Sequence, residues 1–351
     1  MDKNLYVRKI YLEKLREIAT VAVVFLHIVM TINNNYTISE IGQVNYTIFS
    51  DCYMLVKWAV PCFIMITGSL LLNPQKDVSV KKIVRYVSRM LLILFSFGTI
   101  YALIEIFFNE RTITFTTILR SIVNTASGNT WSHMWYIYVL IALYILTIPI
   151  KSFINTQSLK TLKIFIIVLI IGNFAIPTIN AIFNLSLEGY MMLNEYASYY
   201  MLGYYLSSIP TSELKKYFKW CVLGLILSTG VMVVSESISL LTVKEELLMN
   251  HHAGELMVLI QSASVFLIVK YMYENNKREL SRTNQIISLC SFGIYLIHPF
   301  WINLIYKFLK ITPLSFPIVG IGIVILFIIV FILSLMSAYI MKKIPIINKI
   351  V

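Results

Sequence analysis

Residues 317–341 read PIVGIGIVILFIIVFILSLMSAYIM, an unbroken run of 25 residues without a charged side chain. A helix needs about 20 apolar residues to cross the roughly 30 Å hydrocarbon layer of a bilayer, so this run predicts a transmembrane helix. Similar stretches recur along the chain and give ten predicted spans. They lie at approximately 18–33, 52–72, 90–108, 134–150, 164–183, 196–210, 220–243, 256–273, 286–306 and 317–341. The expected fold is all-α, a polytopic membrane bundle forming a single domain over residues 1–351.

The composition supports this class. The 351-residue chain is 58% hydrophobic and 13% charged, with a mean hydropathy of +0.78. Soluble proteins are usually about 45–50% apolar and about 25% charged. The difference excludes an ordinary cytosolic enzyme, a disordered protein and a secreted disulfide scaffold. The four cysteines have neither metal-binding nor redox spacing, and we predict no metal site.

The distribution of Lys and Arg predicts the orientation. Alternate connections, together with both chain ends, carry 22 of these residues, whereas the opposite connections carry 5; Lys57 and Lys270 fall within spans and complete the 29. Because cytoplasmic loops are enriched in Lys and Arg, both termini are expected in the cytoplasm. The net charge of +12 is then a topology signal, and no nucleic-acid partner is expected. The longest connection, 109–133, is too short for a soluble catalytic domain.

Ionisable side chains deep in a membrane are costly and usually mark function. Those within the predicted spans are His27, Lys57, Glu105, Glu236 and His298, with Lys270 near a predicted cytoplasmic end. We expect Lys270 to extend its ammonium group to the interface. Lys57 and Glu105 both lie in the outer parts of their spans and either serve function or pair with each other. The three aspartates fall outside the spans, which disfavours an aspartate-oriented serine triad in the membrane.

Arg16 and His27 are the most informative pair. They are eleven residues apart, which on a helix is three turns plus about 20°, so both side chains share one face. The separation along the axis is about 16 Å, which places Arg16 at the cytoplasmic surface and His27 near the midplane. The alternative is a buried histidine that only bonds a neighbouring helix.

A second polar stripe lies in the ninth predicted span. Ser288, Ser291, Tyr295 and His298 follow one another at intervals of 3, 4 and 3 residues, so they lie along one helix face. Pro299 removes a backbone donor beside His298. The stripe either lines a cavity or bonds a neighbouring helix.

The segment Trp131-Ser132-His133-Met134-Trp135-Tyr136 begins the fourth predicted span on its outer side. His133 is suited to hydrogen bonds with a polar substrate, and the aromatic face of Trp135 is suited to stacking on a sugar ring. Trp and Tyr are also common at membrane interfaces, so Trp135 has an alternative role as an anchor.

The chain resembles the acyltransferase-3 family of integral membrane acyltransferases. Five stretches carry the resemblance: Leu15-Arg16-Glu17-Ile18-Ala19 leading to His27; Val60-Pro61-Cys62-Phe63-Ile64-Met65-Ile66-Thr67-Gly68; His133-Met134-Trp135-Tyr136; Tyr200-Met201-Leu202-Gly203-Tyr204-Tyr205; and Ser291-Phe292-Gly293-Ile294-Tyr295-Leu296-Ile297-His298-Pro299. The arginine–histidine spacing is the most specific of them. Thr67 departs from the serine that the family more often has, but it keeps the hydroxyl.

The resemblance implies acyl-CoA as the donor, a glycan or related envelope molecule as the acceptor, and a catalytic His27 supported by Arg16. A midplane imidazole can act as a general base near neutral pH, which fits that role. Lys82, Arg85 and Arg89 form a predicted cytoplasmic basic rim that either holds the phosphates of CoA or only reflects membrane topology.

We therefore predict a multi-pass protein of the cell membrane that transfers an acetyl group from acetyl-CoA to a hydroxyl of a surface polysaccharide or its lipid-linked precursor. The residues assigned to substrate binding are Glu105, His133, Trp135, Tyr295 and His298. The main alternative is a transporter or flippase for a glycan or small polar solute, and a structural partner in a polysaccharide synthase ranks last. Homo-oligomers are compatible with the sequence.

Overall fold

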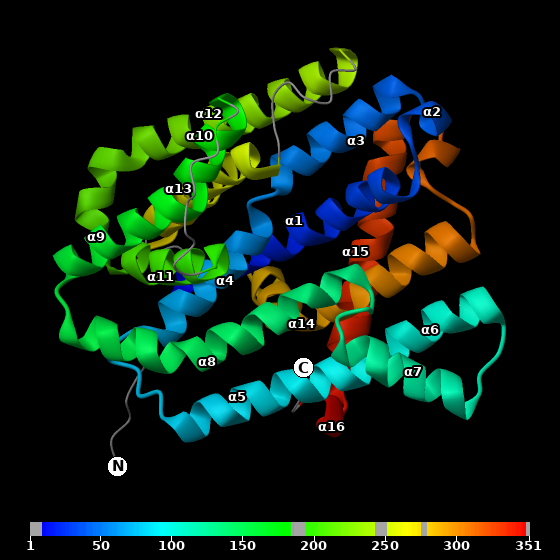
Figure 1. Ribbon diagram of the computed structural model, residues 1–351, viewed down its shortest axis with the longest axis horizontal. Helices are drawn as coiled ribbons and strands as arrows, with labels where there is room; N and C mark the ends of the chain where they lie inside the picture. The colour runs from blue at the N-terminus through cyan, green and yellow to red at the C-terminus, as the bar shows by residue number, and fades with distance from the viewer. Residues whose placement is uncertain (1–8, 184, 186–193, 243–250, 275–278, 349–351) are drawn as a thin grey trace. The chain divides into compact units, whose positions relative to one another are not determined.

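The structure is a computed structural model that describes residues 9–183, 185, 194–242, 251–274 and 279–348, and its regular elements in these residues are helices (Figure 1). Within these residues, nine helical segments are long and apolar enough to cross a membrane. They are Ile10–Asn35, Gln43–Leu71, Val80–Glu110, Ser132–Thr156, Leu159–Phe183, Thr211–Leu240, Gly254–Glu274, Arg282–Phe308 and Val319–Lys343. The expected polytopic all-α class is confirmed.

The helices cluster into two compact units. The first comprises Met1–Leu70 and Leu159–Ala338, and the second comprises Leu71–Ser158 and Tyr339–Val351. The helices of the first unit are α1 (Ile10–Asn35), α2 (Ile38–Ile41), α3 (Gln43–Val56), α4 (Ala59–Leu71), α9 (Leu159–Ile170), η3 (Ile171–Ala175), α10 (Ile176–Phe183), α11 (Glu195–Ser208), α12 (Thr211–Thr242), α13 (His251–Glu274), α14 (Arg282–Asn303), η4 (Leu304–Phe308), η5 (Pro313–Ser315) and most of α15 (Val319–Lys343). Those of the second are α5 (Val80–Ile93), η1 (Leu94–Gly98), α6 (Thr99–Glu110), α7 (Phe115–Ala126), η2 (Ser132–Met134), α8 (Trp135–Thr156) and α16 (Pro345–Asn348).

Helix α1 is the centre of the first unit. It packs against α3, α13 and α14. Its side chains Val24, Ile28 and Ile32 are fully buried in one apolar cluster with Phe49 of α3 and Ile294 of α14. Burying a large aliphatic side chain stabilises the fold by about 1.5–3 kcal/mol in water, but lipid tails are as apolar as leucine. In a membrane this cluster therefore fixes the position of α1 mainly through close packing.

The sixth predicted span is shorter than expected. It forms α11, whose 14 residues extend only about 21 Å at 1.5 Å per residue. Most of the helix is nevertheless buried, including the polar side chains of Ser198 and Ser207. The ten predicted spans thus become nine long helical segments and one short buried helix in the described part of the chain.

Two glycines allow α4 and α11 to cross at backbone contact. A Cβ atom added at Gly68 would lie 1.8 Å from the carbonyl oxygen of Tyr200, and one added at Gly203 would lie 2.1 Å from that of Met65. The hydroxyl of Ser69 donates to the Gly203 carbonyl at 2.8 Å. Small residues at such crossings let helix backbones approach closely in a membrane.

Lys270 of α13 caps the C-terminal end of α11. Its Nζ donates to the carbonyl oxygens of Leu206, Ser207 and Ile209 at 3.1, 2.8 and 2.5 Å, and its side chain is only 1% exposed. The last carbonyls of a helix have no partner within that helix, and an ammonium group has three donors to offer them. Lys270 thus binds the end of a neighbouring helix with its side chain buried, and its Nζ also lies 3.8 Å from the carboxylate of Glu274 at the end of α13.

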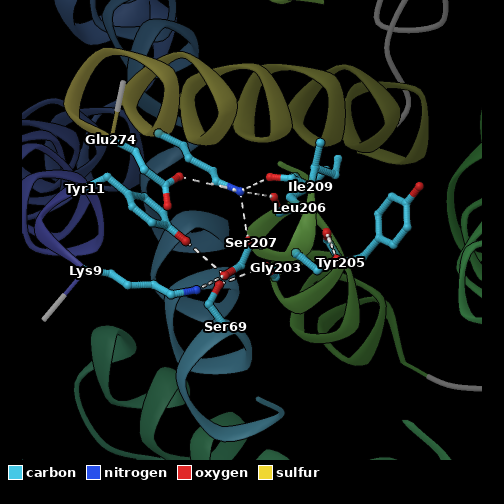
Figure 2. A network of polar contacts seen from close by, with 11 residues as sticks. Lys9, Tyr11, Ser69, Gly203, Tyr205, Leu206, Ser207, Ile209 and Glu274 are labelled. Atoms are coloured by element: carbon cyan, nitrogen blue, oxygen red, sulfur yellow. Dashed lines mark hydrogen bonds and ion pairs between the residues drawn. The ribbon is translucent and has the colours of Figure 1, made fainter. Parts of the chain in front are cut away.

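The same end of α11 is tied to the start of α1. Lys9 and Tyr11 both donate to the hydroxyl of Ser207, at 3.0 and 2.9 Å (Figure 2). Burial lowers the pKa of Lys9, and the nearby carboxylate of Glu274 partly offsets this effect. The network joins α1, α11 and α13.

The second span also differs from its prediction, because α3 and α4 together begin at Gln43. Asp51 therefore lies inside the span, and the placement of all aspartates outside the spans is wrong. The carboxylate of Asp51 accepts from the hydroxyl of Ser237 at 3.0 and 3.1 Å. Lys57, at the break between the two helices, pairs with Glu255 at 3.5 Å.

In the second unit, α5, η1 and α6 form one continuous span that packs against α8 and α7. The ammonium group of Lys151 donates to the carbonyls of Leu71 and Asn73, at 3.2 and 2.5 Å, where α4 ends. Leu71 is the last residue of α4 and the first residue of the second unit, so a buried lysine again binds carbonyls at a helix end. The predicted connection 109–133 contains helix α7.

Replacing Gly203 with alanine will test the glycine crossing. Gly203→Ala should lower the detergent melting temperature strongly, because overpacking costs about 1–3 kcal/mol and here the new methyl group meets backbone atoms. Gly230→Ala is the matched control, since a Cβ at Gly230 of α12 meets nothing within 4 Å. Equal melting temperatures for the two variants would contradict the crossing.

Replacing Lys270 with methionine will test the cap. Each buried carbonyl that loses its donor should cost about 1–3 kcal/mol, so we expect Lys270→Met to melt well below the wild type in detergent. The exposed Lys219 provides the control Lys219→Met, which should leave the melting temperature unchanged. Wild-type stability in Lys270→Met would show that the cap contributes nothing.

Candidate active site

The candidate site in the first unit is built on α1. This helix is unbroken from Ile10 to Asn35, so Arg16 and His27 keep the predicted spacing of about 16 Å along one face. Both side chains are partly buried. The helix thus carries a cation near its N-terminal end and an imidazole near its middle.

The structure brings His27 together with His298, a pairing that the sequence did not predict. Helix α14 packs against α1, and the two imidazole rings meet edge to face with their centroids 4.7 Å apart. The side chain of His298 is fully buried. Two candidate residues from opposite ends of the chain therefore form one cluster.

Hydrogen bonds define which nitrogen of each ring carries the proton. Nδ1 of His27 lies 2.8 Å from the carbonyl oxygen of Val23, and Nδ1 of His298 lies 2.9 Å from that of Ile294. A carbonyl oxygen can only accept a hydrogen bond, so Nδ1 must be the donor in both rings. In a neutral imidazole the remaining nitrogen, Nε2, then holds a lone pair. Both rings are thereby prepared to accept a proton at Nε2.

The polar stripe of α14 faces the protein. Ser288 and Ser291 are buried, and the ring of Tyr295 lies 6.4 Å from that of His298. Pro299 interrupts the backbone ladder within the helix, and the side-chain amide of Asn303 donates to its carbonyl at 2.8 Å. The structure thus places Tyr295 and His298 together, as their spacing predicted.

A second cluster lies in the second unit, around His133. The side chain of His133 is 3% exposed and meets the ring of Tyr101 at 5.5 Å. Tyr101 stacks on Trp131 with ring centroids 4.3 Å apart and planes 6° from parallel. The indole Nε1 of Trp131 donates to Glu105 at 3.2 Å. Three elements, α6, η2 and the segment before η2, thus place an imidazole and a carboxylate beside one aromatic stack.

Trp135 has different surroundings from this cluster. Its side chain is 40% exposed, and its ring contacts that of the adjacent Tyr136 at 6.1 Å. Sequence reasoning missed Tyr101 and did not select Trp131. A signal was present, because Tyr101 precedes Glu105 by four residues and so shares its helix face.

The basic residues of α5 lie toward the surface of the second unit. Lys82 pairs with Asp77 at 2.9 Å, and both side chains are exposed. Such a pair contributes little to folding stability, so Lys82 can exchange it for a ligand at little cost. Arg85 is exposed and Arg89 partly buried. Four residues separate the two arginines, so their side chains share one helix face.

Comparison with known proteins identifies the family to which the chain belongs. A model of the acyltransferase-3 family, described as an acyltransferase domain, matches residues 9–341. The chain belongs to the acyltransferase-3 family. No curated protein and no solved structure matches it.

The match confirms the resemblance found in the sequence. The match covers both histidine clusters and nearly the whole chain. The acyltransferase domain therefore consists of the membrane helices themselves. Apolar helices and family together identify a multi-pass membrane acyltransferase.

Proposed function

We propose that this acyltransferase moves an acyl group, most simply acetyl, from acyl-CoA to a hydroxyl of a cell-surface polysaccharide or its lipid-linked precursor. We place it in the cell membrane. The observation that carries the proposal is the pair of imidazoles from α1 and α14, each with Nδ1 bonded to its own helix and Nε2 prepared to accept a proton.

His27 is the proposed general base. Its Nε2 takes the proton of the acceptor hydroxyl while the hydroxyl oxygen attacks the thioester carbonyl carbon. The bond from that carbon to sulfur then breaks, and the proton passes from the imidazole to the leaving sulfur, so the products are an ester and free CoA. His298, whose ring lies 4.7 Å away, also holds a lone pair at Nε2 and is suited to accept a hydrogen bond from a neighbouring hydroxyl of the acceptor.

Cationic side chains support the donor site. CoA carries several phosphate charges, and arginine binds phosphate through two parallel hydrogen bonds. We assign Arg16 of α1 and Lys82, Arg85 and Arg89 of α5 to the phosphates. The exposed side chains of Lys82 and Arg85 are compatible with this role.

The second cluster supports an acceptor that is rich in hydroxyls. We assign Glu105, His133, Trp135, Tyr295 and His298 to acceptor contacts, and the structure adds Tyr101 and Trp131 as neighbours of the first two. Carboxylates and imidazoles hydrogen-bond hydroxyl groups, and the exposed ring of Trp135 provides an aromatic surface on which a sugar can stack.

His27→Asn will test the base. The asparagine amide nitrogen takes the place of Nδ1 and can keep the bond to Val23, but no group remains at Nε2. We expect release of free CoA thiol from acetyl-CoA, in the presence of extracted surface glycan, to fall by about 10²–10⁴-fold. The melting temperature should stay close to that of the wild type. His298→Asn is the matched variant, and a larger loss there with near-normal His27→Asn would reassign the base.

The same variants separate an acyltransferase from a transporter in cells. A deletion strain should lack one acyl mass in its surface glycans by mass spectrometry, and the wild-type gene should restore this mass whereas His27→Asn should not. A transporter would change the amount or location of the glycan but leave its acyl content unchanged, and that result would contradict the proposal.

The donor assignment makes a separate prediction about affinity. Arg85→Gln and Arg89→Gln should each weaken acetyl-CoA binding about tenfold or more, because a hydrogen bond to a charged group contributes about 1.5–3 kcal/mol. Lys160→Gln, at an exposed lysine of α9, is the control and should bind normally. Unchanged binding by isothermal titration in both arginine variants would limit these residues to a role in topology.

A further inference from the structure

Helix α7 has an inverted distribution of polar and apolar side chains. Its buried face consists of Thr117, Ser121 and Thr125, spaced four residues apart. Its outward face is mainly apolar and includes Phe115, Ile118, Leu119, Ile122 and Val123, with exposed fractions of 74%, 38%, 47%, 40% and 62%. Thr116 and Arg120 are the exposed polar side chains between them. A helix at a water-facing surface has the opposite arrangement, with its apolar stripe turned inward.

The buried hydroxyls of α7 are satisfied within the helix itself. Thr117, Ser121 and Thr125 donate to the carbonyls of Thr114, Ile118 and Ser121 at 2.8, 2.7 and 2.9 Å. Their small size permits close approach to the neighbouring helix, since a Cβ added at Gly98 would lie 2.8 Å from Cγ2 of Thr125. Small hydroxyl residues at a helix contact are typical of membrane interiors.

The packing of α7 places it at membrane depth. Arg111 adopts a left-handed conformation with φ of 58°, where α6 ends, and α7 then runs back along α6 as far as η1 (Figure 1). Its last turn meets Gly98, which lies twelve residues, or about 18 Å, inward from the end of the span at Glu110. Gly98 also lies nine residues, or about 14 Å, from Arg89 at the basic end of the same span. In a hydrocarbon layer of roughly 30 Å, the last turn of α7 is therefore near the midplane.

The position of the one cation within α7 also agrees with a helix that lies at membrane depth. Arg120 pairs with Glu110 at the tip of the hairpin, with Nη2 2.5 Å from Oε1. The guanidinium group is thus directed back toward the end of the span, as a charged side chain must be when its helix lies in lipid. The apolar side chains of α7 remain on the outside.

We propose that α7 is a re-entrant half-helix that enters the outer leaflet and contacts lipid acyl chains through Phe115, Ile118, Leu119, Ile122 and Val123. The neighbouring helix of the hairpin also exposes apolar side chains, among them Ile100 and Phe107 of α6. Exposed apolar side chains on both helices, at the depth derived above, favour acyl chains as the occupant over water or another protein. The connection 109–133 is then part of the membrane domain.

Site-specific photocrosslinking in native membranes tests this assignment. The photoreactive residue p-benzoylphenylalanine replaces Leu119 or Val123 in the full chain, and adducts are identified by mass spectrometry after illumination. Ile328 of α15, which is exposed within a span, is the lipid-facing control position, and the exposed Ser39 beyond the end of α1 is the water-facing control.

We expect both α7 positions to give phospholipid adducts at a yield within about twofold of position 328, whereas position 39 gives essentially none. A cross-linked dimer would assign the face to a second copy of the chain, and an adduct with another protein would assign it to a partner; either result overturns the proposal. Absence of adducts at 119 and 123, in variants that keep the wild-type melting temperature, overturns it as well.

Discussion

The contact between α1 and α14 holds the imidazoles of His27 and His298 with their ring centroids 4.7 Å apart, and the candidate active site depends on it. Fully buried Val24, Ile28 and Ile294 lie in one apolar cluster on the same two helices. A hydrogen bond from Nδ1 to the carbonyl four residues earlier fixes each ring on its own helix. Packing thus determines the separation of the rings, and the local hydrogen bonds determine which nitrogen can accept a proton.

Elsewhere in the first unit, several contacts between helices supply hydrogen-bond partners to backbone groups at a helix end. The last carbonyls of a helix have no partner within that helix, so the buried end of α11 needs a donor from another helix. Lys270 supplies that donor, and Lys9 and Tyr11 join the same end to α1 through Ser207. Gly203 lets α11 approach α4 to backbone contact, and the hydroxyl of Ser69 donates to the Gly203 carbonyl there.

Hydropathy and charge identified the fold class and most of the spans, because a membrane imposes a length and a composition on every helix that crosses it. They also predicted the shared face of Arg16 and His27, since that relation lies within one helix. Contacts between helices were not predictable in this way. The meeting of His27 with His298 and the capping role of Lys270 each depend on segments far apart in the chain.

Helix α7 escaped prediction for a different reason. Its Ser and Thr residues lower the mean hydropathy of residues 109–133, although Thr117, Ser121 and Thr125 are buried against the span. A four-residue spacing of hydroxyls opposite an apolar face was the available signal. Asp51 escaped in a similar way, because polar residues preceding the apolar run concealed the start of α3 at Gln43.

The central claim is that His27 acts as the base for transfer from a CoA thioester. The most direct measurement is an experimental structure of the protein in a lipid nanodisc with a non-reactive acyl-CoA analogue. We predict that the acyl carbonyl carbon lies within about 5 Å of Nε2 of His27, which leaves room for a hydroxyl within hydrogen-bond reach of both. A donor bound with its acyl group far from both His27 and His298 would contradict the claim.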